Sequence, residues 1–221
     1  MDIITVEFHC HTRYSKDSLV PVERLLAECR KKGIDRVVVT DHNEIIGGVE
    51  AARLDPQRVI VGEEVMTTRG ELLAAYVTEK VPRGLEPREA IARLRAQGAF
   101  ISVSHPFDTV RNGAWALEDL LEIAPLVDAI ETFNSRCMDA KPNEEAQAFA
   151  REHNLAGTAG SDAHTLQELG RATLRLPPFD GPESLKAALV HAQIVGRLSS
   201  PWVHFMSMYA RMRKEMKAGK K

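Results

Sequence analysis

The feature that most constrains the fold of this chain is a repeated alternation of short apolar runs with amphipathic helical segments. The runs are rich in β-branched residues and lack clean polar–apolar alternation, which is typical of strands buried on both faces of a parallel sheet. There are seven, at Ile3–Phe8, Val37–Thr40, Val59–Gly62, Leu72–Val77, Phe100–Val103, Ala129–Thr132 and Ala156–Gly160. Seven such strands alternating with helices favour a closed or nearly closed parallel barrel, with an open doubly wound sheet as the alternative.

Helical periodicity separates several of these runs. Residues 21–33 begin with proline and end with glycine, and the apolar positions between them follow the i, i+3, i+4, i+7 spacing of a helix. Residues 87–98 repeat this design, and the patterns at 143–153 and 184–192 predict two further helices. Residues 45–58 carry no clear pattern.

The length of the chain fits one hydrophobic core, and we predict a barrel domain over residues 1–198. An eight-stranded barrel typically takes about 250 residues, so a chain of 221 favours a shorter, distorted version. The segment Trp202–Lys221 is rich in methionine and then basic, and it predicts a helical extension, residues 199–221, packed on the barrel. The basic face of this extension is expected to be solvated, with contact to nucleic acid as the alternative.

Composition narrows the classes of function. The net charge of −2 gives no bulk signature of a nucleic-acid or membrane partner. The N-terminus lacks the pattern of a signal peptide, and no apolar stretch approaches the roughly 20 residues of a membrane helix. Cys10, Cys29 and Cys137 lack the spacing of a metal site and are expected to be free thiols in a reducing compartment. We therefore expect a cytoplasmic protein without a membrane partner.

Residues of metal-ligand types follow the predicted strands at the point where each strand ends. They are His9-Cys10-His11, Asp41-His42, Glu63-Glu64, His105, Glu131 and Asp162-Ala163-His164. Active sites of α/β barrels lie at the C-terminal ends of the strands, so these groups are expected to converge in one mouth. Burying so many titratable groups without a metal would be costly. The sequence therefore predicts a metal site.

The spacing of these residues has a geometric reason. Residues i and i+2 of a strand point to the same face, so His9 and His11 direct both imidazoles at one point, and Asp162 and His164 have the same relation. Imidazole nitrogen combined with carboxylate oxygen, and without thiolate, suits manganese, iron or zinc. A carboxylate such as Glu64 can bridge two ions about 3.5–4 Å apart.

The segments HCHTRYSKDS, TDHNEIIG, GEEVMT, SHPFD, IETFN and GSDAH resemble, in this order, the motifs of the PHP (polymerase and histidinol phosphatase) family. The resemblance covers roughly residues 5 to 196. It implies an α/β fold, a distorted (β/α)7 barrel with parallel strands and outer helices, that binds two or three divalent ions. It also implies a phosphoesterase in which a metal-activated hydroxide, and no nucleophilic side chain, attacks the phosphate ester.

By motif, the resemblance implies three groups of ligands. They are His9, His11, Glu64 and Asp162 for one ion, Glu64 and His105 for a second, and His42, His164 and Asp17 for a third. The register of Asp17 is offset by one from the commoner Y-S-D form. Several relatives place a further histidine shortly after the bridging glutamate, where this chain reads GELLAAYV and offers only Glu71 as a ligand type. Glu131 and Asn134 match the family's E-x-x-N element, which is expected behind the ligands or beside the substrate.

Other polar residues near these motifs are expected to serve the site indirectly. Asp41 is expected to orient a ligand histidine, and Glu63 to be an outward or capping acid. Arg13, Arg136 and Lys141 lie close in sequence to the motifs and are candidates to grip a phosphate, with a solvated surface role as the alternative.

The expected substrate is a small phosphorylated metabolite or nucleotide, and the sequence does not choose among such esters. Two other classes of function remain as alternatives. An amidohydrolase acting on a C–N bond also uses H-x-H on its first strand and a late aspartate. A metal-stabilised scaffold without catalysis is favoured by the missing histidine after Glu64.

Overall fold

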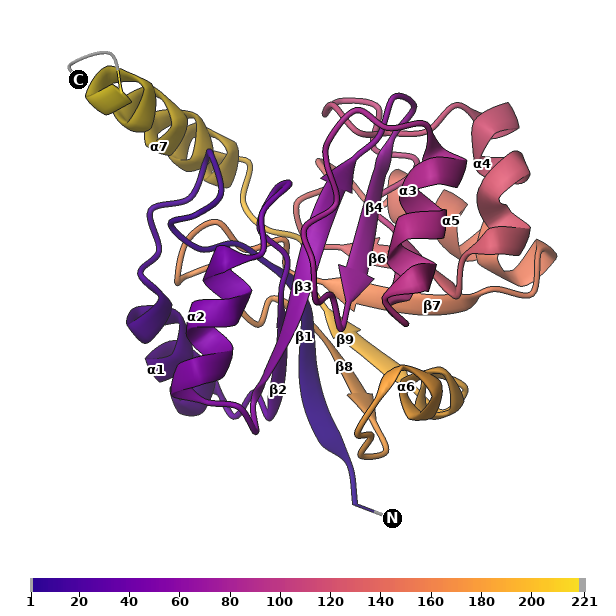
Figure 1. Cartoon of the computed structure of the whole chain (residues 1–221), viewed down its shortest axis with the longest axis horizontal. Helices are drawn as coiled ribbons and strands as arrows, with labels where there is room; N and C mark the ends of the chain where they lie inside the picture. The colour runs from indigo at the N-terminus through magenta and orange to yellow at the C-terminus, as the bar shows by residue number, and fades with distance from the viewer. Residues whose placement is uncertain (1, 219–221) are drawn as a thin grey trace.

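A computed structural model describes residues 2–218, and over this range the strands form one sheet in the order β7-β6-β5-β4-β3-β2-β1-β8-β9 (Figure 1). The strands are β1 (Ile4–Cys10), β2 (Arg36–Val39), β3 (Val59–Met66), β4 (Glu71–Ala75), β5 (Phe100–Val103), β6 (Ala129–Asn134), β7 (Ala156–Gly160), β8 (Ala172–Leu176) and β9 (Gln193–Gly196). All seven predicted strands are present as β1 to β7. β8 and the edge strand β9 were not predicted, and every residue of β9 is exposed, so its sequence carries little of the pattern of a buried strand.

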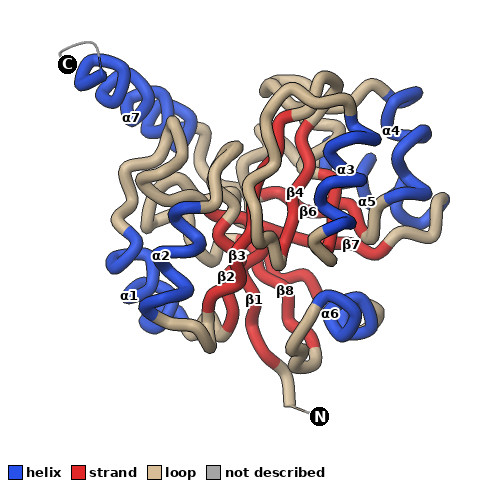
Figure 2. Tube along the Cα trace, in the orientation of Figure 1, coloured by secondary structure: helices blue, strands red, loops and turns tan. Residues whose placement is uncertain are grey.

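Helices lie on the outside of this sheet (Figure 2). They are α1 (Val22–Lys32), α2 (Ile46–Leu54), α3 (Pro87–Ala96), α4 (Leu117–Ile123), the short 3-10 helix η1 (Ala124–Leu126), α5 (Lys141–Glu152), α6 (Pro182–Leu189) and α7 (Trp202–Ala218). The helices predicted from periodicity are confirmed as α1, α3, α5 and α6. α2 forms in the segment without a clear pattern, and α4, of seven residues, buries only Leu120 and Ile123.

The α/β barrel class is confirmed, with one strand reversed. β1, β2 and β3 pair in parallel, as do β5, β6 and β7, whereas β4 is antiparallel to both β3 and β5. Only residues 67–70 join β3 to β4, and a parallel pair needs a crossover of a dozen or more residues, so β4 must fold back as a hairpin. The first residue of β4 therefore lies at the same end of the barrel as the last residues of the parallel strands.

The barrel closes at that end, which we call the mouth. The N–H of His11 donates to the Ala163 carbonyl at 2.8 Å, and the N–H of Ala163 donates to the His9 carbonyl at 3.3 Å, so the segment after β7 joins β1. At the other end of β1, residues 4–6 pair with β8 instead, and β8 pairs with β9. The sheet is therefore a barrel at the mouth and opens into an antiparallel edge at the far end.

Apolar side chains fill the space beneath the mouth. Phe8 on β1 and Phe100 on β5 meet edge to face with ring centroids 5.6 Å apart, although their strands are not neighbours in the sheet. Their contact therefore crosses the barrel interior, which is packed rather than open. The buried carboxylate of Glu7 accepts hydrogen bonds from the N–H groups of Ser161 and Gly170, both at 2.9 Å, and so ties β1 to the chain after β7.

The C-terminal helix α7 leaves the barrel on the side of the mouth (Figure 1). Ala210 of α7 is buried, whereas Trp202, Phe205 and Tyr209 are exposed. Residues 219–221 of the predicted extension lie outside the described residues. Within residues 2–218, no helix is long and apolar enough to cross a membrane.

Candidate metal centre

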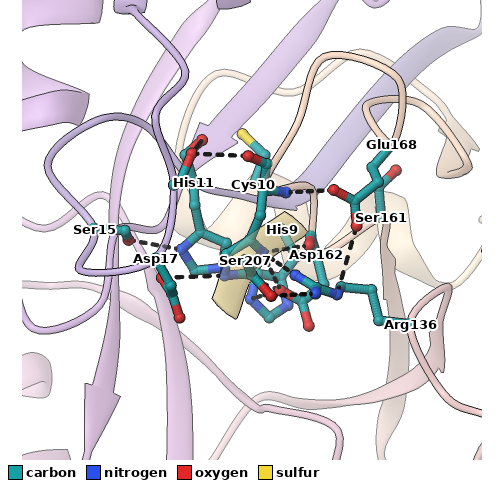
Figure 3. Close-up of polar contacts among 12 residues, drawn as sticks. His9, Cys10, His11, Ser15, Asp17, Arg136, Ser161, Asp162, Glu168 and Ser207 are labelled. Carbon is teal, nitrogen blue, oxygen red and sulfur yellow. Dashed lines mark hydrogen bonds and ion pairs between the residues drawn. The ribbon is translucent and has the colours of Figure 1, made fainter. Parts of the chain in front are cut away.

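Seven elements bring imidazoles and carboxylates together at the mouth. The residues are His9 and His11 at the end of β1, Asp17 in the following loop, His42 after β2, Glu64 on β3, Glu71 at the start of β4, His105 after β5, Glu131 on β6, and Asp162 and His164 after β7. Figure 3 shows His9, His11, Asp17 and Asp162 gathered from different parts of the chain. Every ligand position expected from the motifs is part of this gathering.

Glu64 lies between two sets of histidines. Its Oε2 atom is 3.3 Å from His9 Nε2 and 3.4 Å from His11 Nε2. Its Oε1 atom is 3.3 Å from His105 Nε2. On the far side of the first pair, Asp162 Oδ1 is 3.2 Å from His11 Nε2 and 3.6 Å from His9 Nε2. The two oxygens of Glu64 therefore face different histidines, which is the arrangement a carboxylate needs to bridge two cations.

Asp17 occupies a second junction despite the offset of its motif. Its Oδ2 atom is 3.4 Å from His42 Nε2, and its Oδ1 atom is 3.3 Å from His164 Nε2. The other ring nitrogen of His42, Nδ1, is 2.9 Å from Glu64 Oε2. His42 therefore stands between the two junctions and faces a carboxylate with each nitrogen.

Three of the histidines are oriented from behind by oxygen atoms. His9 Nδ1 is 3.0 Å from Glu131 Oε1, His11 Nδ1 is 2.9 Å from Ser15 Oγ, and His164 Nδ1 is 2.8 Å from the Asp162 carbonyl. In His9 and His11, a proton held on Nδ1 by such an oxygen leaves the lone pair of Nε2 free for a cation. In each of these rings, Nε2 is the atom that faces the mouth.

Asn134 links the residues behind the ligands. Its side-chain N–H group donates to Glu131 Oε2 at 3.0 Å and to Asp162 Oδ2 at 3.3 Å. Asp162 has φ of +51°, a left-handed conformation that is uncommon outside glycine and costs free energy unless its surroundings fix it. Hydrogen bonds from Asn134 and ion pairs with the histidines supply such surroundings.

The electrostatics of the mouth are dominated by carboxylates. Burial lowers the pKa of His9, but the charges of Asp162 and Glu64 outweigh burial and raise that pKa well above its usual value. The pKa of His42 is raised in the same way, by Glu64 and Asp17 against burial. His11 behaves oppositely, since burial and the positive charge of His164 lower its pKa to about 3. The carboxylates therefore favour positive charge at this point of the mouth, which divalent cations would supply.

Orphaned polar atoms at the mouth fit a metal. Among residues 2–218, five buried side-chain atoms of the mouth residues find no hydrogen-bond partner, namely His9 Nε2, His42 Nδ1, Glu64 Oε2, Asp17 Oδ1 and His105 Nδ1. Buried polar atoms without partners are rare and destabilising. Three of these atoms converge, since Glu64 Oε2 lies 3.3 Å from His9 Nε2 and 2.9 Å from His42 Nδ1, whereas Asp17 Oδ1 lies 3.3 Å from His164 Nε2. Three groups of residues can each direct one atom at a common point: His9, His11 and Glu64; His11, His42 and His164; and His42, Glu64 and Glu71. The donor set, nitrogen and carboxylate oxygen without sulfur, suits divalent transition metals.

Two residues expected to serve the site point elsewhere. The carboxylate of Asp41 accepts hydrogen bonds from the N–H and the hydroxyl of Thr12, each at 2.6 Å, and not from a histidine ring. Asp41 precedes His42 by one residue, and its side chain turns to the β1 loop instead. Arg13 is largely exposed and pairs with Glu50 of α2 at 2.6 Å, outside the mouth. Its expected contact with a phosphate is therefore not supported.

Arg136 is buried, contrary to the surface alternative. Its side chain is 3% exposed, contacts the His164 ring and donates to the Val203 carbonyl at 3.2 Å. It also donates to Ser207 Oγ at 2.9 Å, and Figure 3 shows both of these residues. It therefore joins a candidate metal ligand to α7. The third basic candidate, Lys141, is exposed and lies 3.8 Å from Glu145 on α5.

Sequence reasoning missed Arg111, which lies in the loop after β5. Its guanidinium contacts the Asp162 carboxylate, pairs with Asp108 at 2.7 Å and donates to Asn134 Oδ1 at 3.3 Å. It lies three residues after the SHPFD segment, and no periodic pattern marks it. Glu71 was noted as a ligand type but not assigned, and its Oε1 and Oε2 atoms lie 3.5 Å from His42 Nδ1 and His105 Nε2, respectively.

A pocket of about 320 Å³ opens onto these groups. It is lined by Lys16, Asp17, His42, Met66, Glu71, His105, Val110, Arg111, Asn112, Arg136, Asp162, His164, His204, Ser207 and Arg211. The last three belong to α7, so the C-terminal helix forms one wall. This wall was not foreseen from the sequence, which predicted only that the helix packs on the barrel.

The chain is similar in sequence to two family models and to a curated protein. The model described as "PHP domain" matches residues 7–95, and the model described as "PHP-associated" matches residues 140–194. An uncharacterized protein of Methanocaldococcus jannaschii is 37% identical over 173 residues, which cover 77% of this chain and 69% of that protein.

Solved structures share the fold at low sequence identity. A two-domain protein from Bacteroides vulgatus, described as containing a predicted PHP-like metal-dependent phosphoesterase, superposes with a TM-score of 0.71 at 18% identity over 89% of this chain. The present chain spans only 65% of that protein. A lesion-specific endonuclease from Pyrococcus furiosus gives a TM-score of 0.65 at 19% identity over 90% of this chain and 60% of its own. These likenesses show the shared fold, and the two matching family models show that the chain belongs to the PHP family.

Proposed function

We propose that this protein is a metal-dependent phosphoesterase whose mouth holds two or three divalent ions of manganese, iron or zinc. The observation that carries the proposal is the position of Glu64, whose two oxygens face His9 and His11 on one side and His105 on the other. Asp162 would complete the first site, and Asp17, His42 and His164 a third. Bound there, the ions would activate water for attack on phosphorus and neutralise the phosphate oxygens.

The chain's own residues would position these ligands and the substrate. Glu131, Ser15 and the Asp162 carbonyl hold the rings of His9, His11 and His164 so that Nε2 faces the mouth. Arg111 and Arg136 line the pocket, and guanidinium groups bind phosphate oxygens well. Both are already engaged with ligand residues, so they would also fix the position of Asp162 and His164.

The size of the pocket favours a small substrate. About 320 Å³ is at the lower end of the range for small-molecule sites, and α7 bounds one side. We therefore propose a small phosphorylated metabolite or a nucleotide. The solved endonuclease of similar fold makes a nucleic-acid end the second candidate.

The organisation of the chain is part of the proposal. Residues 1–198 would form the barrel, and residues 199–221 a helical extension packed on it. Contacts of Val203 and Ser207 with the buried Arg136 support this division.

The decisive experiment is hydrolysis of p-nitrophenyl phosphate and of a panel of phosphorylated metabolites, with manganese, iron and zinc each supplied separately. Amides, lactones and a short oligonucleotide form the comparison arms. Metal-dependent phosphate release that disappears in Glu64→Gln is the expected result. Hydrolysis of amides alone would refute the phosphoesterase proposal and indicate an amidohydrolase. Bound metal without hydrolysis of any substrate would indicate a non-catalytic scaffold.

A further inference from the structure

We propose that Glu71 is a metal ligand, that it binds one ion together with Glu64 and His105, and that this carboxylate-rich set selects manganese over zinc. The inference deepens the proposed function and rests on it, because it requires ions at the mouth. It concerns the one part of the site for which the motifs supply too few ligands.

The reversal of β4 places Glu71 at the mouth. Glu71 is the first residue of β4 and lies opposite Met66, the last residue of β3. In a parallel strand, the first residue would lie at the far end of the barrel. The hairpin therefore converts a position remote from the site into one beside His42 and His105.

The carboxylate of Glu71 is buried and directed at two histidines. The side chain is 3% exposed, with Oε1 3.5 Å from His42 Nδ1 and Oε2 3.5 Å from His105 Nε2. Within residues 2–218, these histidines supply both of its ion-pair contacts. Separations of 3.5 Å are too long for strong hydrogen bonds, and they suit two ligands on a shared cation.

The surroundings of Glu71 hold it in this orientation. Its N–H donates to the Gly113 carbonyl at 3.0 Å, and its carbonyl accepts hydrogen bonds from Trp115 Nε1 at 3.0 Å and from the Ser104 N–H at 3.1 Å. Gly113 has φ of +102°, and a side chain there would approach Glu71 Oε2 to 2.2 Å. The loop after β5 therefore packs its backbone directly against the carboxylate.

The number of available lone pairs makes Glu71 necessary. His42 belongs to two candidate groups, one with His11 and His164 and the other with Glu64 and Glu71. A neutral imidazole offers one lone pair and can serve only one of them. If His42 binds the ion beside His164, it is lost to the neighbouring ion, and the motifs then supply that ion with two ligands, Glu64 and His105. Glu71 raises this set to three protein ligands, the number usual in catalytic sites that leave one position open.

The donor chemistry of this set predicts its metal. Two carboxylates and one imidazole form an oxygen-rich set, and such sets suit manganese, whereas imidazole-rich sets suit zinc. Replacing Glu71 by histidine would change this ligand set to two imidazoles and one carboxylate. The identity of residue 71 would therefore decide the preference of this ion.

The test is metal content and affinity, measured by equilibrium dialysis against Mn²⁺ and Zn²⁺ separately and in competition, followed by elemental analysis. The proteins are the wild type, Glu71→Ala, Glu71→Gln, Glu71→His and the control Glu63→Gln. Glu63 is a buried carboxylate on β3 that accepts a hydrogen bond from the Val81 N–H at 2.9 Å, away from the mouth. Glu71→Ala and Glu71→Gln are expected to bind one ion per chain about 100-fold more weakly. Glu71→His should keep the ion but shift the competition toward Zn²⁺ by about tenfold or more, and Glu63→Gln should match the wild type.

The outcomes separate the two proposals. A wild type that binds no metal overturns the proposed function and this inference together. A wild type that binds metal, with unchanged affinity in Glu71→Gln and Glu71→Ala, overturns only the role of Glu71. Unchanged competition in Glu71→His overturns the predicted selectivity. If Glu71→Ala fails to fold, as judged by circular dichroism, the nearly isosteric Glu71→Gln and the ligating Glu71→His decide the result.

Discussion

His9 Nδ1 lies 3.0 Å from Glu131 Oε1, on the side of the ring opposite Glu64 and Asp162. The second oxygen of Glu131 accepts a hydrogen bond from the backbone N–H of His105 at 2.9 Å. One carboxylate behind the site, that of Glu131, therefore positions two candidate ligands from different strands. A change in the position of this carboxylate would displace both His9 and His105.

We expect Glu131→Ala to weaken metal binding by about 10- to 100-fold, because partners of this kind fix the tautomer and orientation of the ligand. Glu131→Gln should have a smaller effect, since an amide oxygen can still accept the proton of His9. The measurement is the dissociation constant for Mn²⁺ in each variant. Equal affinities in Glu131→Ala and the wild type would refute the positioning role.

Neighbouring acids on β3 should respond differently to the same substitution. Glu64→Gln keeps the shape of the side chain but removes the charge that a bridge between two cations requires, so phosphoesterase activity should fall by orders of magnitude. Glu63 points to the opposite face, and burial raises its pKa to about 7, so Glu63→Gln should be tolerated far better. Phosphate release and metal content are measured for both. Comparable losses, or a larger loss in Glu63→Gln, would show that the bridging carboxylate is wrongly assigned.

Removal of metal should lower both activity and thermal stability. Divalent ions bind the folded site and not the unfolded chain, so at an ion concentration 100 times the dissociation constant they stabilise the fold by about 2.7 kcal/mol. For a domain of this size, that corresponds to a melting temperature lower by about 5–10 °C after chelation. Calorimetry before chelation, after chelation and after metal is restored checks the prediction. An unchanged melting temperature in protein verified to be free of metal would contradict it.

The sequence predicted strands β1 to β7 and the candidate ligand positions because both follow from local patterns. His9 and His11 are two residues apart at the end of β1, so alternation alone directs them together. The same argument does not apply to Asp162 and His164, which lie beyond the end of β7, where Asp162 adopts a left-handed conformation. They converge with the others through a turn that the spacing did not reveal.

Contacts that depend on chain direction or on distant loops could not be read from local patterns. The position of Glu71 depends on the four-residue connection that reverses β4. Arg111 reaches Asp162 from a loop without periodicity, and α7 reaches the pocket across the whole chain. Asp41 shows the converse, since its motif suggested a histidine partner and the fold supplied Thr12.

The last prediction concerns Lys214 of α7, whose ammonium group donates to the carbonyls of Arg13, at 2.6 Å, and Ser15. Burial lowers the pKa of Lys214, which marks it as a docked group rather than a solvated one. The loop that it holds also carries Asp17, beside His42 and His164.

Lys214→Ala should therefore loosen this loop, lower the free energy of unfolding by about 1–3 kcal/mol and reduce the affinity for one ion. Lys217→Ala, one turn further along α7 at an exposed position, is the matched control and should change neither quantity. Metal content and denaturant unfolding of both variants make the comparison. Indistinguishable behaviour of the two variants would mean that α7 does not support the Asp17 side of the site.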